Sequence, residues 1–429
     1  MFTRSSQIKD IFTTGTVLEE WFSPMMRSVE KQRFSDAQFS ALPMASFILS
    51  GCLRHLLAAR SLREYIQTLF HMDVNQSMLP IARSTWSDAL ASNSRRDILR
   101  SAMTHLVCVA RETLPDRLAG IEGIGSREVI ATDATYQNES DHYRPEYPMQ
   151  GGLDNQKGHM LLSHYDLRRG IALHVTTETK SMGEMRVLKQ AETQSTSWLR
   201  TPRAIHVVDR AYIDGRFWDQ RFELYGSTVI TRTKSVMKFA LVTQEKIIEC
   251  MSNDGVQYDH RVSLLNSKGI WRVIGFQAQD GITYEYLTND LTLLPGIVAF
   301  LYHRRWDKEK YYDCFKNDLA GSKAWGKSAV AIEQQALLGI VTVLLTRLFL
   351  HRRQIDLQRN TPDSTQDNKH KNKQKNALLS DINIRLRTNW CHLSKITRQL
   401  WRFLKNCFNY KHEHALYTRQ LAPLLRQHL

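Results

Sequence analysis

Residues 128–133 read EVIATD and residues 204–209 read AIHVVD, and these two stretches decide the fold. Each is a short, mostly apolar run that ends in an aspartate, Asp133 in the first and Asp209 in the second. Such runs are typical of buried strands, and a carboxylate at the carboxyl end of a strand in an open α/β sheet faces the crevice where ligands bind. Either aspartate alone could simply cap the next helix. Together they indicate a site for a hard cation such as Mg²⁺, which prefers oxygen ligands.

The segments around these strands alternate between strand and helix patterns. Residues 160–165 and 171–176 flank a turn and predict a hairpin, and residues 184–192 predict a helix. Strand, hairpin, helix and strand in this order are typical of a mixed α/β fold. Residues 228–231, 270–274 and 283–287 favour strands, so we expect a mainly β insertion at about residues 222–295. Helical periodicity returns at Pro295 and continues to Leu350.

The rest of the chain is predicted to be helical or polar. We expect a helical N-terminal domain at 1–125, with helix starts near 61–64 and 94–97, an α/β domain at 126–350, a polar flexible linker at 351–377 and a small basic helical region at 378–429. Arg83 to Trp86 combine arginine with short hydroxyl residues, which suits phosphate contacts at a helix start, but an ordinary helix cap explains the pattern better.

The charge of the chain favours an anionic partner. Its 429 residues include 58 Lys and Arg against 43 Asp and Glu, a net charge of +15. Residues 351–429 hold 16 of these basic and 5 of these acidic residues, a net of +11, so the first 350 residues carry only +4. A basic tail of this kind is typical of an electrostatic clamp on phosphate, or of a solvated tail that keeps the protein soluble. The composition excludes a disordered chain, a collagen-like repeat and a disulfide-stapled mini-protein.

Other features favour a soluble cytoplasmic protein without a membrane segment. The six cysteines form no CxxC pair, which is typical of thiols in a reducing compartment. The N-terminus lacks the apolar core of a signal peptide. The longest apolar run, at residues 336–350, is shorter than the ~20 residues that a membrane span needs.

A third acidic residue is expected within residues 301–316 (LYHRRWDKEKYYDCFK). On a continuous helix, Tyr302, Arg305, Glu309 and Lys316 fall within an arc of about 60°. Glu309 could then complete a three-carboxylate metal site, with Arg305 and Lys316 holding phosphate oxygens and Tyr302 bonding a phosphate or stacking on a base. On spacing alone, a solvated amphipathic helix with an Arg305–Glu309 ion pair explains the pattern better.

These residues also resemble a known signature. The pattern Tyr-x2-Arg-x3-Glu-x6-Lys at Tyr302, Arg305, Glu309 and Lys316 is similar to the YREK signature of the insertion-sequence-four family of DDE transposases, which are bacterial cut-and-paste enzymes. Residues 132–135 (TDAT), 207–212 (VVDRAY) and 287–290 (LTND) resemble the family's other motifs in the same order. The resemblance covers about residues 80–350. It departs from the family at Ala211, where Gly is common, and at residues 307–308 and 311–312.

The resemblance implies an RNase H-like core, interrupted by a β insertion between Asp209 and Glu309. It implies that Asp133, Asp209 and Glu309 hold two Mg²⁺ ions, or Mn²⁺ as a substitute, for in-line displacement at a phosphodiester. The implied partners are double-stranded DNA, as terminal inverted repeats and as target, and a second copy of the chain in a homodimeric synaptic complex. Expected DNA contacts are Tyr302, Arg305, Lys316, Arg210 and Trp271, the last as a platform for a flipped base.

Two other functions use the same residues. One is a metal-dependent DNA nuclease that cuts without strand transfer, and the other is a non-catalytic DNA-binding protein derived from a transposase. The second would be expected to lose an acidic residue, whereas all three are present. Asp214, Asp219 and Asp307 are nearby alternatives for the carboxylates, but the first two close no apolar strand and Asp307 lies about 160° round a helix from Glu309.

Overall fold

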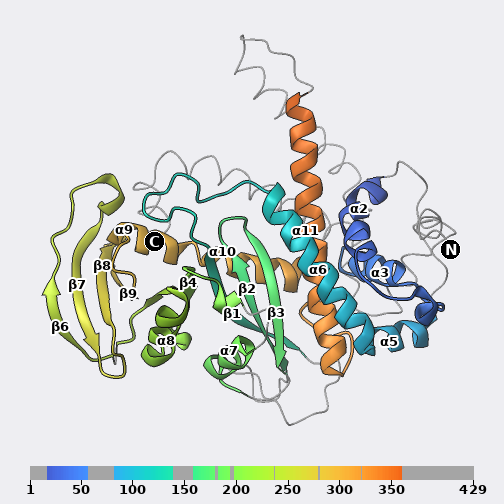
Figure 1. Cartoon of the computed structure of the whole chain (residues 1–429), viewed down its shortest axis with the longest axis horizontal. Coiled ribbons are helices and arrows are strands. Elements are labelled where there is room, and N and C mark those ends of the chain that lie inside the picture. Colours follow the sequence, from blue (N-terminus) through green and yellow to red (C-terminus); the bar gives the residue numbers. More distant parts are fainter. Residues whose placement is uncertain are drawn as a thin grey trace.

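A single sheet of nine strands runs through the computed structural model, which describes residues 17–56, 82–138, 158–178, 182–193, 198–235, 237–278, 281–319 and 321–359. The strand order is β3-β2-β1-β4-β5-β9-β8-β7-β6. Figure 1 shows β1–β3 near the centre of the molecule and β6 at its left edge. The strands are β1 (Val129–Asn138), β2 (Gly158–Asp166), β3 (Ile171–Glu178), β4 (Ile205–Val208), β5 (Thr228–Arg232), β6 (Phe239–Gln244), β7 (Val256–Leu264), β8 (Ile270–Gln277) and β9 (Thr283–Thr288).

The direction of the strands changes along the sheet. β3, β2 and β1 pair antiparallel, whereas β1, β4 and β5 pair parallel. From β5 onward, β9, β8, β7 and β6 are antiparallel. Parallel neighbours need a crossover, and α8 (Gly215–Tyr225) supplies it between β4 and β5. Asp214 caps the start of α8 by accepting from the Phe217 amide at 3.1 Å, and Gly226 ends it in the left-handed conformation at φ 65°.

Helices cover both faces of the sheet. On one face, α7 (Glu184–Glu192) and α8 pack Val187, Leu188 and Trp218 against Val208 and Val229 of the strands. On the other, α9 (Pro295–His303) belongs to a larger apolar cluster with strand residues such as Val207 and Ile230. Two buried clusters thus lie on opposite sides of the parallel strands, which explains why β4 is buried at every position.

The same larger cluster includes a helical layer. It contains α2 (Val17–Glu30), α3 (Met44–Leu56), α5 (Arg83–Ala91) and α6 (Asn93–Thr113), which lie around the long α11 (Ala329–Arg359) at the right of Figure 1, with a short 3-10 turn, η1 (Asp36–Phe39). The described part of residues 1–125 is therefore mainly helical, and it shares one apolar core with α11 and the sheet. The helix start expected at 61–64 lies outside the described residues.

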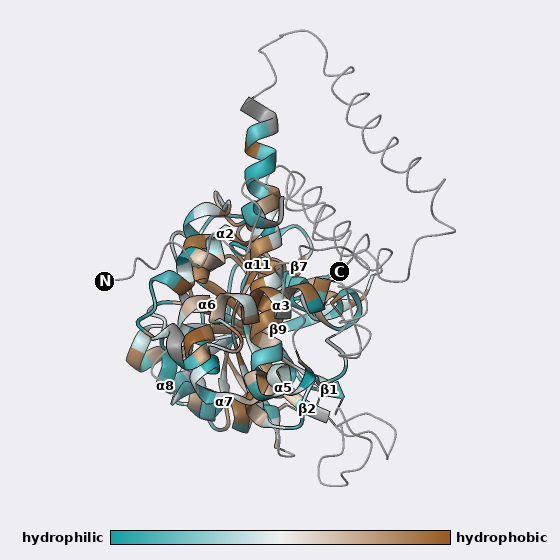
Figure 2. Cartoon of the chain, turned by 90° about the vertical axis from the view of Figure 1, so that its right-hand side faces the viewer, coloured by the Kyte–Doolittle hydropathy of each residue, from teal (hydrophilic) through white to brown (hydrophobic). Residues whose placement is uncertain are grey.

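Helix α11 is apolar because it is buried. Its residues Ala329–Asp356 are long and apolar enough to cross a membrane, yet 83% of the most apolar stretch is buried inside the protein. Figure 2 shows this apolar part within the helical layer and a hydrophilic end that projects from it. Within the described residues, α11 therefore has the character of a core helix of a globular protein.

The expected mixed α/β fold is confirmed at this level, and three details differ. The strands of the expected β insertion continue the main sheet, because β9 pairs with β5. Strand β6 was not expected; all of its residues are exposed, so no buried face leaves an alternating pattern in the sequence. Helix α11 also continues through Arg359, into the segment expected to be a linker.

Candidate active site

Asp133 and Asp209 occupy neighbouring positions on parallel strands. The pairing of β1 with β4 ends at Thr132 and Val208, so each aspartate is the next residue of its own strand or turn. Asp133 does not end its strand as expected, because β1 continues to Asn138 with β2 as its partner. It is instead the first β1 residue beyond the β4 pairing. The two side chains interact electrostatically, and both are half-buried.

Glu309 reaches the site from α10 (Trp306–Asp313). The single helix expected over 301–316 is broken: α9 ends at His303, and α10 starts after a tight turn in which the Arg305 amide donates to the Tyr302 carbonyl at 3.0 Å. A wide turn, η5 (Cys314–Asp318), follows α10 and carries Lys316. The four signature residues therefore come from three consecutive short segments rather than from one helical face.

Arg305 joins the acidic residues. Its guanidinium lies 2.7 Å from Glu309 and 3.5 Å from Asp133, and its side chain is 10% exposed. The guanidinium also interacts with Asp209 and lies 5.5 Å from the Tyr302 ring centre. Burial alone would lower the pKa of Arg305, but Tyr302 and the carboxylates raise it above its usual value. The structure thus brings Asp133, Asp209 and Glu309 into one neighbourhood around a single cation.

The carboxylates do not close around a metal ion as they stand. Their oxygen atoms are the donors that Mg²⁺ and Mn²⁺ prefer. However, within the described residues no group of three or more His, Cys, Asp or Glu side chains is placed so that it could hold a metal ion. The chemistry of the donors fits such a cation, whereas their arrangement does not. The Arg305 guanidinium contacts both Asp133 and Glu309.

The other signature residues lie at the same centre. Lys316 is half-buried and interacts with Asp133; burial lowers its pKa, and Asp133 opposes that effect. Tyr302 is 6% exposed, packs against Tyr286 at 5.2 Å and interacts with Asp209. Burial raises the pKa of the Tyr302 hydroxyl, so this group stays protonated and can donate a hydrogen bond.

A buried network behind Asp133 was missed by the sequence reasoning. Lys308 has no exposed surface, and its ammonium donates to the Ser163 carbonyl at 2.6 Å, the Ser163 hydroxyl at 2.5 Å and the Tyr312 hydroxyl at 3.0 Å. Tyr312 in turn donates to the Asp133 carbonyl at 2.7 Å. Burial lowers the pKa of Lys308 to about 7, although Asp133 opposes this. Desolvation also raises the pKa of Asp133, while Lys308 and Arg305 lower it.

A fourth carboxylate, Glu184, also faces the site. It begins α7, and it interacts with Asp133 and Asp209 as well as with the phenols of Tyr136 and Tyr212. Burial and the two aspartates raise the pKa of Glu184. No sequence pattern marks Glu184, since one acidic residue in the first turn of a helix is usual.

The two remaining expected DNA contacts differ in their placement. Arg210 is exposed and directly follows Asp209, so it is available to a ligand at this site. Trp271 is only 1% exposed, and its indole donates to the Ser267 hydroxyl at 2.7 Å. The stacking role expected for Trp271 does not fit this burial, because the ring packs in the cluster beneath α7 and α8.

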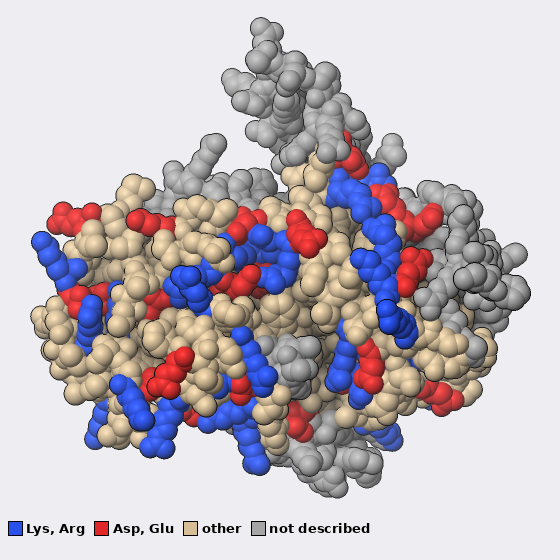
Figure 3. Space-filling view, in the orientation of Figure 1, with Lys and Arg blue, Asp and Glu red and all other residues tan. Residues whose placement is uncertain are grey.

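On the face of the described residues that Figure 3 shows, the charges do not mark a single binding surface. In Figure 3, Lys and Arg are interspersed with Asp and Glu over the visible face. Within 83–86, Arg83 is exposed at the start of α5, whereas Trp86 is 2% exposed and packs on Phe47. The basic region at 378–429 lies outside the described residues, so its expected role stays a prediction.

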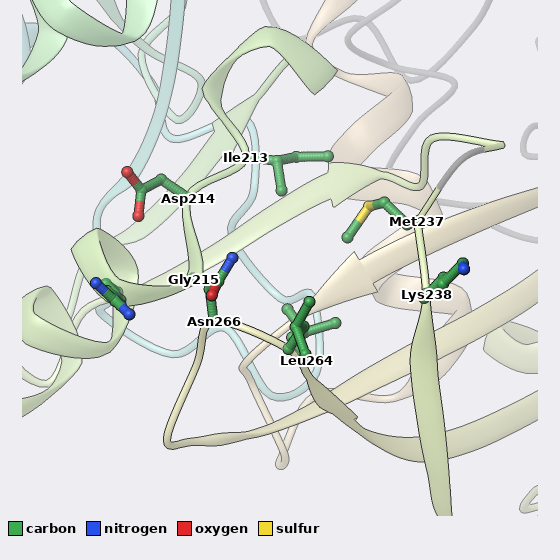
Figure 4. A pocket seen from close by; sticks show the side chains of 9 residues that line it. Ile213, Asp214, Gly215, Met237, Lys238, Leu264 and Asn266 are labelled. Carbon is green, nitrogen blue, oxygen red and sulfur yellow. The ribbon is translucent and has the colours of Figure 1, made fainter.

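A separate pocket lies beside the β6–β8 strands. It has a volume of 480 Å³ and is formed by the start of α8, the segment leading into β6 and the turn after β7. Figure 4 shows Ile213, Met237 and Leu264 around it, with Lys238 and Asp214 at opposite sides. None of the expected site residues lines it.

Comparisons with known proteins leave the family open. No family model matches the chain, and no curated protein matches it. Among solved structures it is similar to a piggyBac transposase, determined by cryo-electron microscopy as a synaptic complex with hairpin DNA. The two chains are 8% identical, the match covers 83% of this chain and 82% of the other, and the TM-score is 0.39. A likeness of this size carries no argument about fold or activity.

Proposed function

We propose that this protein is a DNA transposase of the DDE type, which cleaves the ends of a mobile element and joins them to a target. The observation that carries the proposal is the placement of Asp133, Asp209 and Glu309 around Arg305. Carboxylates from distant parts of a chain are seldom brought together at the end of parallel strands without a functional reason, because their mutual repulsion costs stability.

The sheet supports the same proposal. Three antiparallel strands followed by two parallel ones, in the order β3-β2-β1-β4-β5, are consistent with the RNase H-like core that the sequence resemblance implies. Asp133 then lies on β1 and Asp209 directly follows β4, the strand beside it. We propose that β6–β9 are the insertion of this core, and that the N-terminal helices bind the terminal repeats within a homodimeric synaptic complex.

The residues around the carboxylates have properties that suit a DNA phosphate. Arg305 offers a planar fork of donors, Lys316 a point charge, and Tyr302 a protonated hydroxyl. Arg210 is exposed beside them. We propose that these side chains hold the backbone near the scissile bond, while the Lys308 network fixes the β1 backbone at Asp133. The cofactor we propose is a pair of Mg²⁺ or Mn²⁺ ions, which would supply charge neutralisation at the reacting phosphate.

The test is an assay of cleavage and joining by the full chain. The substrate is a labelled duplex carrying the DNA that flanks the reading frame, with a supercoiled plasmid as target and Mg²⁺ or Mn²⁺ in the buffer. We expect Asp133→Asn, Asp209→Asn and Glu309→Gln each to lower cleavage on the order of 100-fold or more, while DNA binding persists. Glu223→Gln, on the exposed side of α8, is the control and should cleave normally.

The products separate the alternative functions. Insertion of 3′-hydroxyl ends into the plasmid supports a transposase, and cleavage without insertion would identify a nuclease. Binding without any cleavage by the unaltered protein would point to a non-catalytic DNA-binding protein. Normal cleavage by Glu309→Gln would show that Glu309 is not part of the active site.

A further inference from the structure

Arg305 lies where a shared cation would be expected. Its two terminal nitrogens contact different carboxylates, Glu309 at 2.7 Å and Asp133 at 3.5 Å, and Asp209 also interacts with it. In the DNA-free chain, the guanidinium is thus the positive charge shared by the three acidic side chains. Within the described residues, no group of three or more His, Cys, Asp or Glu side chains is placed so that it could hold a metal ion.

The same guanidinium is incompletely satisfied in this position. Its Nε is buried and has no hydrogen-bond partner, and the contact to Asp133 is at the limit of a hydrogen bond. A buried donor without a hydrogen-bond partner destabilises the position that it occupies. A phosphate group could accept from two nitrogens of the guanidinium at once, so Arg305 has a better partner available in DNA than in its resting position.

We propose that Arg305 is a positioning residue that couples DNA binding to cation binding. When DNA is bound, the guanidinium moves from Asp133 and Glu309 to a backbone phosphate, and the freed carboxylates can take a divalent cation. The inference rests on the proposed function, because it assumes that these carboxylates bind a divalent cation. It adds an order of events: the three carboxylates bind a divalent cation only weakly until DNA is bound.

Such coupling must be reciprocal. If DNA raises the affinity for the cation by a given factor, the cation raises the affinity for DNA by the same factor, and couplings of this kind are usually about 5- to 150-fold. The coupling factor can therefore be measured in two ways, from the effect of DNA on cation affinity and from the effect of the cation on DNA affinity. Neither measurement needs catalysis.

The experiment measures Mn²⁺ binding to the full chain by electron paramagnetic resonance, with and without the flanking-DNA duplex. For the unaltered protein, we expect the duplex to tighten Mn²⁺ binding by about tenfold or more. For Arg305→Gln, we expect Mn²⁺ to bind about tenfold more tightly without DNA, and the duplex to have little further effect. Arg261→Gln, which loses an ion pair to Glu245 on a distant strand, should behave like the unaltered protein.

Two further variants test whether Arg305 opposes cation binding by filling the space between the carboxylates or only by its positive charge. Arg305→Lys keeps the charge but loses the fork that spans Asp133 and Glu309, so it should also tighten Mn²⁺ binding without DNA. Lys316→Gln removes a charge near Asp133 but leaves Arg305 between Asp133 and Glu309, so it should tighten Mn²⁺ binding less than Arg305→Gln does. Thermal unfolding in a chelator checks that each variant is folded; a purely structural role for Arg305 would lower the melting temperature without raising Mn²⁺ affinity.

The outcomes are distinct. Equal or weaker Mn²⁺ binding by Arg305→Gln and Arg305→Lys without DNA would overturn the coupling. In that case, weakened Mn²⁺ binding by Asp133→Asn would still leave the proposed function standing. If Asp133→Asn binds Mn²⁺ as the unaltered protein does, with and without DNA, the metal centre itself is misplaced and the proposed function fails with it.

Discussion

Lys308 is a lysine inside the protein whose three hydrogen bonds all go to residues that surround the Asp133 backbone. Replacing it by Met keeps the length of the side chain but removes the charge and the bonds to Ser163 and Tyr312. We expect Lys308→Met to lower the free energy of unfolding by about 1–3 kcal/mol, because a buried acceptor loses its donor. Urea denaturation measures this, with the exposed neighbour Lys310→Met as a control that should change little.

Lys308→Met should also change the pH profile of cleavage. The Lys308 ammonium lowers the pKa of Asp133 against the effect of burial, so without it that pKa rises further. We expect the acid limb of the cleavage profile to move to higher pH. An unmoved limb, together with a normal unfolding free energy, would show that Lys308 does not act on Asp133.

At the residue scale, the sequence predicted the contacts that depend on local spacing. The Arg305–Glu309 pair follows from a separation of four residues on a helix, and it is present. The contact of Arg305 with Asp133 could not be predicted from spacing, because it joins two elements whose relation depends on the whole sheet. Glu184 and Lys308 were missed for the same reason: each is unremarkable on its own helix, and its contacts with the site depend on where the sheet places β1, β2 and β4.

At the scale of elements, the close approach of α9 to the turn η4 (Met251–Asn253) depends on Gly296. A Cβ atom there would lie 1.6 Å from the Ser252 carbonyl oxygen, which is backbone and cannot rotate away. We expect Gly296→Ala to push η4 from α9 and to lower the free energy of unfolding by about 1–3 kcal/mol. Gly183→Ser is the matched control, since Gly183 is the N-cap that precedes α7, a Cβ atom added there meets nothing within 4 Å, and Ser is a good helix cap.

Both variants are measured by chemical denaturation. Helix α9 leads into the turn that carries Arg305, so Gly296→Ala should also weaken cleavage, whereas Gly183→Ser should not. Equal stability of the two variants would mean that η4 adjusts freely and does not position α9.

The elements that the sequence predicted well are those with clear apolar patterns. The β2–β3 hairpin, α7, β4, β5 and β9 lie close to their expected bounds, and α9 starts at the expected Pro295, whereas α8 was not predicted. The break between α9 and α10 was not predicted, because residues 303–306 contain no Pro or Gly to mark it. The tight turn there is closed by backbone bonds such as Lys308 to the Arg305 carbonyl at 3.0 Å, which carry no sequence signal.

At the scale of the whole molecule, the mixed sheet was predictable in kind but not in extent. The order of strand and helix patterns indicates an α/β protein, whereas the continuation of one sheet from β5 through β9 to β6 depends on a pairing between distant strands. The shared apolar core of the N-terminal helices and α11 is likewise a matter of long-range packing. Local sequence patterns show which face of each helix or strand is buried. Which buried faces pack together depends on contacts between distant parts of the chain.

His206 links the pH of the solution to the stability of this assembly. It lies on β4, the strand between β1 and β5, with no exposed surface; its ring packs on Trp218 at 5.4 Å and neither ring nitrogen has a hydrogen-bond partner. Burial, together with Arg221, lowers the pKa of His206 to about 3. The folded protein therefore keeps this ring neutral at pH 4–6, whereas the unfolded chain takes up a proton below a pH of about 6.5.

The free energy of unfolding should consequently fall as the pH falls below about 6.5, by about 1.4 kcal/mol per pH unit from this histidine alone, until the pH approaches its folded pKa. Buried carboxyl groups with a raised pKa, such as Asp166, increase the free energy of unfolding as the pH falls. They do so equally in the unaltered protein and in a His206 variant. His206→Phe keeps a ring beside Trp218 and cannot titrate, so its unfolding free energy should fall less steeply between pH 6 and pH 4.5. Urea denaturation at pH 8 measures the packing cost of the substitution, and parallel curves for the two proteins at lower pH would show that His206 is protonated in the folded state.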